Sequence, residues 1–297
     1  MTSPLTGEVP FRSGVLAVGP LELRIEVDAE ADVAHVDSCV RNPSDRPLWL
    51  ESVVLGFRWS GHGVRALRFL RHGWQSWSYT GGRALDDAGE PPFASGAWLR
   101  GLHHAVGAPP PDRTGWHESD LVTVIGASAA GPTCLVGTLE RGRAFGVVHA
   151  RRQLEAVLVE VELRVDAMLG PGETRELERV RIAVGADASE LLEAFAEAHA
   201  RLAGARVSAP FVSGWCSWYH FFHDVSEADV LRNLEALVAA RQELPIEVEQ
   251  IDDGYQRAIG DWLATNHKFP RGLGPLAQEI RAAGFTPGLW TAPFCAV

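Results

Sequence analysis

The chain of 297 residues contains no long hydrophobic run and no surplus of positive charge. No apolar stretch approaches the roughly 18 residues of a membrane span, and the first residues lack the pattern of a signal peptide. The formal charge is −11, without the clustered Lys and Arg that bind phosphate backbones. We therefore expect a cytoplasmic protein with no nucleic-acid or membrane partner and a neutral small-molecule substrate.

Cysteine is sparse as well, with four widely spaced residues and no C-x-x-C pair. They are Cys39, Cys134, Cys216 and Cys295. This spacing predicts neither a zinc site nor a dense disulfide framework, so we expect four buried thiols.

Alternating apolar and polar residues dominate the first two thirds of the chain, from about residue 10 to residue 185. The alternation has period two, which is typical of half-buried antiparallel strands. The segments predicted as strands are 21–28, 48–59, 121–126, 134–139, 157–165 and 180–184. Many short strands without a helical pattern between them predict a large β-sandwich.

A helix is predicted over residues 187–203. Asp187 and Glu190 have the spacing of a helix N-cap with its reciprocal Glu, and Gly204 suits a C-cap. We place a domain boundary after this helix. The expected domains are a β-sandwich with its linking helix at 1–205 and an α/β domain at 206–297.

In the second domain strands and helices alternate. Strands are expected at 211–218, from residue 246 and at 285–294, with helices in between after Ser226 and around Leu276. Successive βαβ units predict a parallel sheet, and a (β/α)8 TIM barrel is favoured because no G-x-G-x-x-G follows the first strand. Since such a barrel needs about 250 residues, we expect a fragment with about three of the eight units.

Two carboxylates follow the second of these strands, in the stretch IEVEQIDDGYQ at residues 246–256. Parallel strands deliver polar side chains to the mouth of an α/β enzyme, which favours Asp252 and Asp253 as ligand-binding acids. The alternative is that the two residues only close the strand and form a turn, because Asp and Gly are common in turns.

Tryptophan is frequent, and several of the ten residues lie beside Gly, Ser or polar residues at expected strand ends. These are Trp74, Trp77, Trp215, Trp218 and Trp290. Tryptophan covers the C–H face of a pyranose while carboxylates accept hydrogen bonds from its hydroxyls, so the combination predicts a sugar site. His220, His223 and His267 fit no metal-ligand spacing, and we predict no metal and no cofactor.

Residues 71–116 form a predicted loop that contains Trp74 and Trp77. Loops of this length are usually functional where they occur. The alternatives are a functional loop and a loop that only packs on a neighbouring domain, and both hold if the loop reaches across the interface between the domains.

Four segments together resemble the melibiase-type α-galactosidases of glycoside hydrolase family 36. They are GWQSW at 73–77, GWCSWYH at 214–220, QIDDGYQ at 250–256 and GLWTAPF at 288–294. The resemblance implies an N-terminal β-supersandwich followed by the first three strands of a TIM barrel. It also implies that Asp252 and Asp253 bind the galactose 4- and 6-hydroxyls.

The same resemblance implies that Trp218, Tyr219 and Trp290 line the sugar pocket and that Trp74 or Trp77 reaches into it from the sandwich. The family's nucleophile lies in a Lys-x-Asp motif on the fourth strand, and its acid/base lies later. Both positions are expected beyond Val297, the last residue of the sequence. We therefore expect no catalytic residue in this chain and no activity of the chain alone.

The resemblance predicts a retaining α-galactosidase in the complete form. The alternatives are a related galactosyl transferase, an α-N-acetylgalactosaminidase, or a non-catalytic vestige that binds carbohydrate. A homo-oligomer of the complete protein is also left open.

Overall fold

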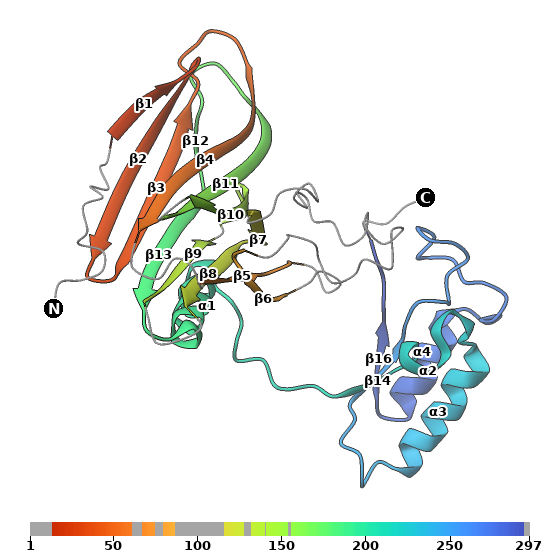
Figure 1. Cartoon of the computed structure of the whole chain (residues 1–297). Helices are drawn as coiled ribbons and strands as arrows, with labels where there is room; N and C mark the ends of the chain where they lie inside the picture. The colour runs from red at the N-terminus through yellow and green to blue at the C-terminus, as the bar shows by residue number, and fades with distance from the viewer. Residues whose placement is uncertain are drawn as a thin grey trace. The chain divides into compact units, whose positions relative to one another are not determined.

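The computed structural model describes residues 14–60, 67–74, 80–86, 116–127, 132–139, 141–153 and 156–293 (Figure 1). Its contacts divide the chain between Ala205 and Arg206 into two compact units. None of the helices in the described part is long and apolar enough to cross a membrane.

The first unit contains two antiparallel sheets. In the described residues the larger sheet has nine strands: β1 (Gly14–Val18), β2 (Leu21–Glu30), β3 (Val33–Arg41), β5 (Leu67–Arg71), β6 (Gly81–Ala84), β8 (Val122–Ala127), β9 (Thr133–Leu139), β12 (Thr174–Glu176) and β13 (Arg179–Gly185). Its order is β1-β2-β3-β13-β9-β8-β5-β6, and β12 pairs with β3. The smaller sheet consists of β4 (Leu48–Ser60), β11 (Ala156–Leu169), β10 (Phe145–Gln153) and β7 (Trp116–Asp120), in that order.

One hydrophobic core joins the two sheets into a sandwich. Val36 and Val180 enter it from the larger sheet, and Val148 and Val161 enter it from the smaller one. Each is at most 2% exposed, and burying a side chain of this kind stabilises the fold by about 1.5–3 kcal/mol. The predicted alternation is confirmed, and with it the antiparallel β-sandwich.

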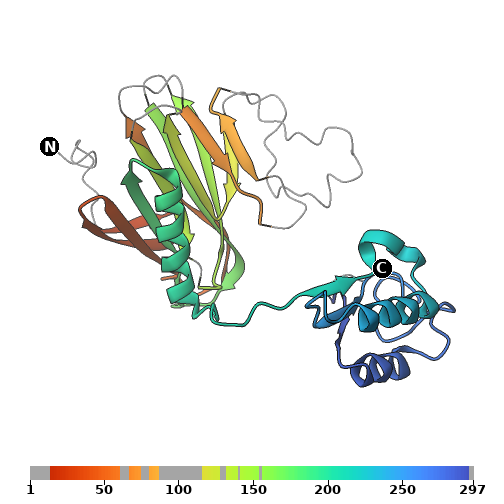
Figure 2. The same cartoon turned by 90° about the horizontal axis from the view of Figure 1, so that it is seen from below.

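Helix α1 (Ala188–Ala203) closes the first unit and lies against β8, β9 and β13 (Figure 2). The Asp187 carboxylate accepts the backbone N–H groups of Ser189 and Glu190, and Gly204 ends the helix at φ +60°. These caps confirm the predicted helix. The buried Phe195 ring packs over Gly137, where an added Cβ would lie 2.7 Å from it. A side chain at position 137 would therefore push the helix away from the sheet.

The second unit contains a parallel sheet in the order β14 (Gly214–Cys216), β15 (Val248–Ile251) and β16 (Thr286–Leu289). Helix α3 (Glu227–Ala239) connects the first two strands, and α4 (Leu273–Ala282) connects the last two. Their apolar faces pack with β15 in a second core that includes Leu234, Ile251 and Ile280. The βαβ order is as predicted, whereas closure into an eight-stranded barrel remains a prediction.

The parallel strands are shorter than predicted. Phe211, expected in the first strand, is 89% exposed outside it, and Trp218 already belongs to the short helix α2 (Trp218–Phe221). The third strand ends at Leu289. The apolar side chains beyond these strand ends made the segments resemble longer strands.

Candidate functional site

The two predicted acids follow the middle strand of the parallel sheet. Ile251, the last residue of β15, is buried in the core. Asp252 and Asp253 come directly after it and leave the sheet in a turn. The turn interpretation is therefore correct as a description of the backbone, but it does not account for the side-chain contacts of the acids.

Asp252 is held by hydrogen bonds on both sides of its carboxylate. Oδ2 accepts Gln250 Nε2 at 2.9 Å and the Cys216 thiol at 3.2 Å. Oδ1 accepts the backbone N–H of Asp253, and the N–H of Asp252 donates to Ser217 Oγ, both at 2.9 Å. Asp252 is only 9% exposed. These contacts fix the carboxylate without any ligand present.

Asp253 is held by one residue of its own turn and by one residue from another segment. Its Oδ1 accepts Gln256 Nε2, and its Oδ2 lies 3.3 Å from His223 Nδ1. Gln256 Oε1 in turn accepts the Gly254 N–H at 3.0 Å. The Asp253 side chain is 13% exposed. Both acids are therefore oriented in advance, which lowers the entropic cost of binding a ligand.

Gly254 allows this arrangement because no other residue fits its position. Its φ is +120°, and an added Cβ would lie 2.7 Å from the carbonyl oxygen of His223. The following loop is tied back by Asn266, whose Nδ2 donates to Gly254 O at 2.8 Å and to Gln256 O at 3.2 Å. The loop thus supports the segment that carries the acids.

Two predicted aromatic residues follow the strands that flank β15. The Trp218 ring packs edge-on against His223, the imidazole beside Asp253, with centroids 4.9 Å apart. The Trp290 N–H donates to Ile251 O at 2.9 Å, one residue before the acids. Tyr219 follows Trp218 on α2 and is 84% exposed. The structure thus connects Trp218 and Trp290 to the acid turn, whereas Tyr219 faces solvent.

Trp290 contacts a residue that the sequence analysis did not identify. Its ring packs edge-on against Trp262, with centroids 5.6 Å apart. Trp262 O lies 3.5 Å from the hydroxyl of the buried Tyr255. The only signal for Trp262 was its aromatic type in the loop after the acids.

Trp215 is not a pocket residue, contrary to expectation. It pairs in register with Glu249 on β15 and packs with Phe221 and the core of the second unit. In a strand, alternate side chains face opposite sides of the sheet. Trp215 therefore lies on the helix-covered side, and its neighbour Cys216 lies on the side of Asp252.

The predicted aromatic residues of the first unit are described only in part. Trp74 is 55% exposed, and its ring packs edge-on against Phe145 at 5.8 Å. Its backbone N–H donates to Asp120 Oδ2 at 3.4 Å, and burial raises the pKa of that carboxyl. Trp77 lies outside the described residues. A sugar-binding role for either tryptophan remains a prediction.

The catalytic carboxylates that the resemblance implies were expected beyond Val297. The described part of the chain ends at Pro293, and Val297 lies outside it. The expectation that the nucleophile and the acid/base follow Val297 is therefore not tested by the structure and stays a prediction.

The thiols differ from expectation in their burial. Cys134 is buried, which raises its pKa to about 12. Cys39 and Cys216 are only partly buried, so the expectation of buried thiols was wrong for both, and Cys295 lies outside the described residues. Cys39 lies on the outward side of β3. Cys216 is the last residue of β14, where fewer core residues cover its side chain.

Metal binding was not expected, and the described residues contain no group of three or more His, Cys, Asp and Glu side chains that could hold a metal ion. His220 packs edge-on against Phe221, and His223 contacts Asp253. His267 is exposed.

Glu249 is a buried carboxyl that the sequence analysis did not single out. It is 0% exposed, and neither of its oxygens has a hydrogen-bond partner in the described residues. Burial raises its pKa to about 7. Glu249 shares the helix-covered side of the sheet with Trp215, so it does not belong with the two acids.

The arrangement around Asp252 and Asp253 suits a polyhydroxylated ligand. Two carboxylates with fixed oxygens accept hydrogen bonds from neighbouring hydroxyls, and these charge-assisted bonds are strong. Aromatic rings beside them can cover an apolar ring face. Four polar residues that orient the acids, Cys216, Gln250, Gln256 and His223, were not predicted as part of the site.

Comparison with known proteins gives the following relatives. No family model matches the chain. Alpha-galactosidase 1 of Pediococcus pentosaceus is 30% identical over 84 residues, which is 26% of this chain and 11% of that protein.

Two solved structures cover much more of the chain. One is TtGalA, an alpha-galactosidase from Thermus thermophilus in complex with p-nitrophenyl alpha-D-galactopyranoside. It is 27% identical to this chain with a TM-score of 0.55, and the match covers 95% of this chain and 49% of the TtGalA chain. The alpha-galactosidase from Lactobacillus brevis is 15% identical, with a TM-score of 0.59 over 92% of this chain and 36% of its own. This chain therefore spans about half or less of these proteins. The resemblance is confirmed: the chain is similar in sequence and fold to the N-terminal region of α-galactosidases of the family 36 type.

Proposed function

We propose that this chain is the N-terminal part of a retaining α-galactosidase and supplies its galactose-binding acids. The observation that carries the proposal is the pair Asp252 and Asp253, which stands in fixed orientation at the carboxyl end of the middle parallel strand. In TIM-barrel enzymes the active site lies at this end of the strands. The similarity to α-galactosidases supports the same placement.

In this proposal the two carboxylates accept hydrogen bonds from the galactose 4- and 6-hydroxyls. Trp218 and Trp290 cover the apolar face of the sugar, and Tyr219 contacts the sugar from the exposed side of the site. In this proposal Asp252 and Asp253 act as hydrogen-bond acceptors, and the roles of nucleophile and general acid fall to the later residues that the family resemblance implies.

Hydrolysis with retention needs two further carboxyl groups about 5 Å apart, one as nucleophile and one as acid/base. We assign them to later strands of the barrel, beyond Val297. The 297-residue chain alone is then inactive, and the complete gene product cleaves terminal α-linked galactose.

The test is to express the complete product of the gene that contains this chain and to assay p-nitrophenyl α-galactoside. We expect turnover with α-galactose as the first product in proton NMR, and no turnover by the 297 residues alone. Galactosyl transfer that outpaces hydrolysis would favour the transferase, and a preference for the N-acetyl substrate would favour the α-N-acetylgalactosaminidase. Galactose binding without turnover would favour the non-catalytic alternative, and the loss of both binding and turnover would refute the proposal.

A further inference from the structure

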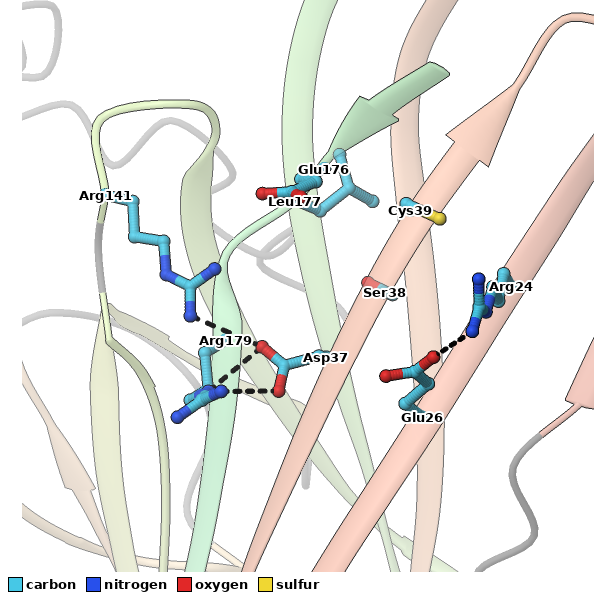
Figure 3. Close-up of a pocket in the computed structure, with 9 residues that line it drawn as sticks. All are labelled: Arg24, Glu26, Asp37, Ser38, Cys39, Arg141, Glu176, Leu177 and Arg179. Atoms are coloured by element: carbon cyan, nitrogen blue, oxygen red, sulfur yellow. Dashed lines mark hydrogen bonds and ion pairs between the residues drawn. The ribbon is translucent and has the colours of Figure 1, made fainter.

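A second site candidate lies on the sandwich, far from the acid pair in sequence. A cavity of about 330 Å³ opens on the outward side of the larger sheet, and Figure 3 shows its lining. The size falls in the range of small-molecule pockets, which is about 300–1,000 Å³. Three arginines and three carboxylates line it: Arg24, Arg141, Arg179, Glu26, Asp37 and Glu176.

The central group of the cavity is an arginine–aspartate–arginine triad. Arg179 donates to both oxygens of Asp37, from Nε at 2.9 Å and from Nη2 at 2.7 Å. Arg141 Nη2 lies 3.4 Å from Asp37 Oδ1, the oxygen that also accepts Arg179 Nε (Figure 3). Two guanidinium groups thus share one carboxylate, which leaves one positive charge uncompensated in the triad.

The other two carboxylates of the cavity contribute less to its charge. Glu26 pairs with Arg24, and Glu176 pairs with Arg143, so each carboxylate has its own arginine. The side chains of Glu26 and Glu176 are 58% and 65% exposed, compared with 34% for Asp37. Exposed charges are screened by water and salt more strongly than half-buried ones. The triad therefore carries the least screened charges that line the cavity.

The neighbouring strand position adds a further arginine beside the triad. His35 lies two residues before Asp37 on the same side of β3, and Arg181 Nη1 lies 3.2 Å from its Nε2. Burial lowers the pKa of His35, and the charges of Arg181 and Arg179 lower it further, against the opposing effect of Asp28 and Asp37. This positive region contrasts with the charge of −11 of the whole chain.

The loop that carries Arg141 is built to hold its position. The carboxylate of Glu178, which is 0% exposed, accepts the backbone N–H groups of Arg141, Arg143 and Ala144. Gly142 provides the turn between the two arginines at φ +77°. A buried carboxylate with three backbone donors fixes the loop, and the Arg141 guanidinium is therefore pre-positioned.

We propose that this cavity binds a small ligand through a single oxyanion group, a carboxylate or a phosphate. Arg179 already donates Nε and Nη2 to Asp37, so the ligand is bound by the remaining Nη donors of Arg141 and Arg179, whose planar groups suit both oxyanions. The ligand class goes beyond the neutral galactoside of the proposed function, and the site belongs to the sandwich alone.

The test uses calorimetric titration of the 297-residue chain at low ionic strength with inorganic phosphate, galacturonate and galactose. We expect saturable 1:1 binding of at least one anion and none of galactose at this site. Binding of phosphate alone would identify a phosphate ligand, and binding of galacturonate alone a carboxylate. Galactose binding that Arg141→Gln weakens as much as it weakens anion binding, or no saturable anion binding, would overturn the proposal.

Variants test the assignment of the site. Arg141→Gln leaves the Asp37–Arg179 pair intact and should weaken anion binding at least tenfold. Glu176→Gln, which removes an exposed negative charge from the rim, should strengthen it. Arg58→Gln, an equal charge change at an exposed position of β4 in the other sheet, should leave it unchanged. If Arg141→Gln binds like the unmodified chain, or if Glu176→Gln weakens binding, the oxyanion assignment is wrong.

Discussion

The thiol of Cys216 donates a hydrogen bond to Asp252 Oδ2 across two neighbouring parallel strands, at 3.2 Å. Gln250 Nε2 donates to the same oxygen at 2.9 Å and also lies 3.6 Å from the Cys216 sulfur. A partly buried cysteine thereby becomes part of the apparatus that orients a proposed sugar-binding acid. Burial and the nearby carboxylate raise the pKa of this thiol, which keeps it protonated and able to donate.

Cys216→Ala in the complete gene product should lower kcat/KM for an α-galactoside about fivefold, because one hydrogen bond is worth about 1 kcal/mol. Cys216→Ser keeps a donor at the same place and should retain most of the activity. Steady-state kinetics on both variants provide the measurement. Equal losses in the two variants would show that the thiol matters for packing and not for hydrogen bonding.

Substitution of the acids tests the sugar site itself. Asp252→Asn and Asp253→Asn keep the side-chain volume but remove the charged acceptor, which is worth about 1.5–3 kcal/mol in a buried hydrogen bond. Each should lower kcat/KM at least tenfold in the complete protein. Discrimination against the 4-epimer should also decrease, because the site no longer penalises a misplaced hydroxyl.

Alanine is the poorer choice at position 252. Asp252 is only 9% exposed, and its removal would leave Cys216 and Gln250 without their shared acceptor. Thermal melting of the Asn variants provides the control for folding. If both Asn variants keep wild-type kinetics and wild-type epimer preference, the two acids only form a turn and do not bind the sugar.

The elements that could be predicted from sequence are those whose local signal agrees with their packing. The helix at α1 carries its own caps, and β11 and β13 contain runs of alternating apolar residues at 157–165 and 180–184, so each was identified. Strand β3 was missed because its inward side includes Ala34 and Ser38, which weaken the apolar pattern. Pairing with β2 and β13 defines this strand, and such pairing is not visible in a local window.

The same distinction applies to the site. Asp252 and Asp253 stand out because paired carboxylates follow an apolar strand. Their partners Cys216 and His223 come from the preceding strand and the segment after it, and nothing in their own neighbourhoods points to the acids. Trp215 and Trp218 share a motif, yet one packs in the core and the other approaches His223. Strand β14 ends between these two residues, so Trp215 lies in the sheet and Trp218 lies beyond it.

Gly254 offers a test of the backbone that positions the acids. Gly254→Ala should destabilise the second unit by about 2 kcal/mol or more, because φ of +120° is strained for alanine and its Cβ would meet the His223 carbonyl oxygen. Gly56→Ala is the control. Gly56 is exposed in β4 and, apart from its chain neighbours, no atom lies within 4 Å of an added Cβ, so alanine should stabilise the strand by about 0.5 kcal/mol.

Denaturant unfolding of the two glycine variants, followed by tryptophan fluorescence, provides the comparison. Opposite signs of the change in unfolding free energy are expected. Similar changes in both variants would mean that the close approach of Gly254 to His223 does not constrain the fold.

The last prediction concerns Glu249 and the pH dependence of stability. Its pKa is raised by burial from 4.5 to about 7. Between these values the unfolded chain releases a proton that the folded chain retains, so stability falls as pH rises through this window. The contribution is complete below pH 4.5 and is lost above pH 7.

Glu249→Gln removes this titration and should gain stability relative to the unmodified chain on going from about pH 4.5 to about pH 7.5, by on the order of 2 kcal/mol. His149 adds a second pH dependence. Burial would lower its pKa, but hydrogen bonds to Glu118 and Glu162 raise it overall, so its stabilisation is also lost as pH rises. Because both chains retain His149, the difference between their unfolding curves isolates Glu249. Parallel curves across the window would show that the Glu249 carboxyl is not kept protonated in the fold.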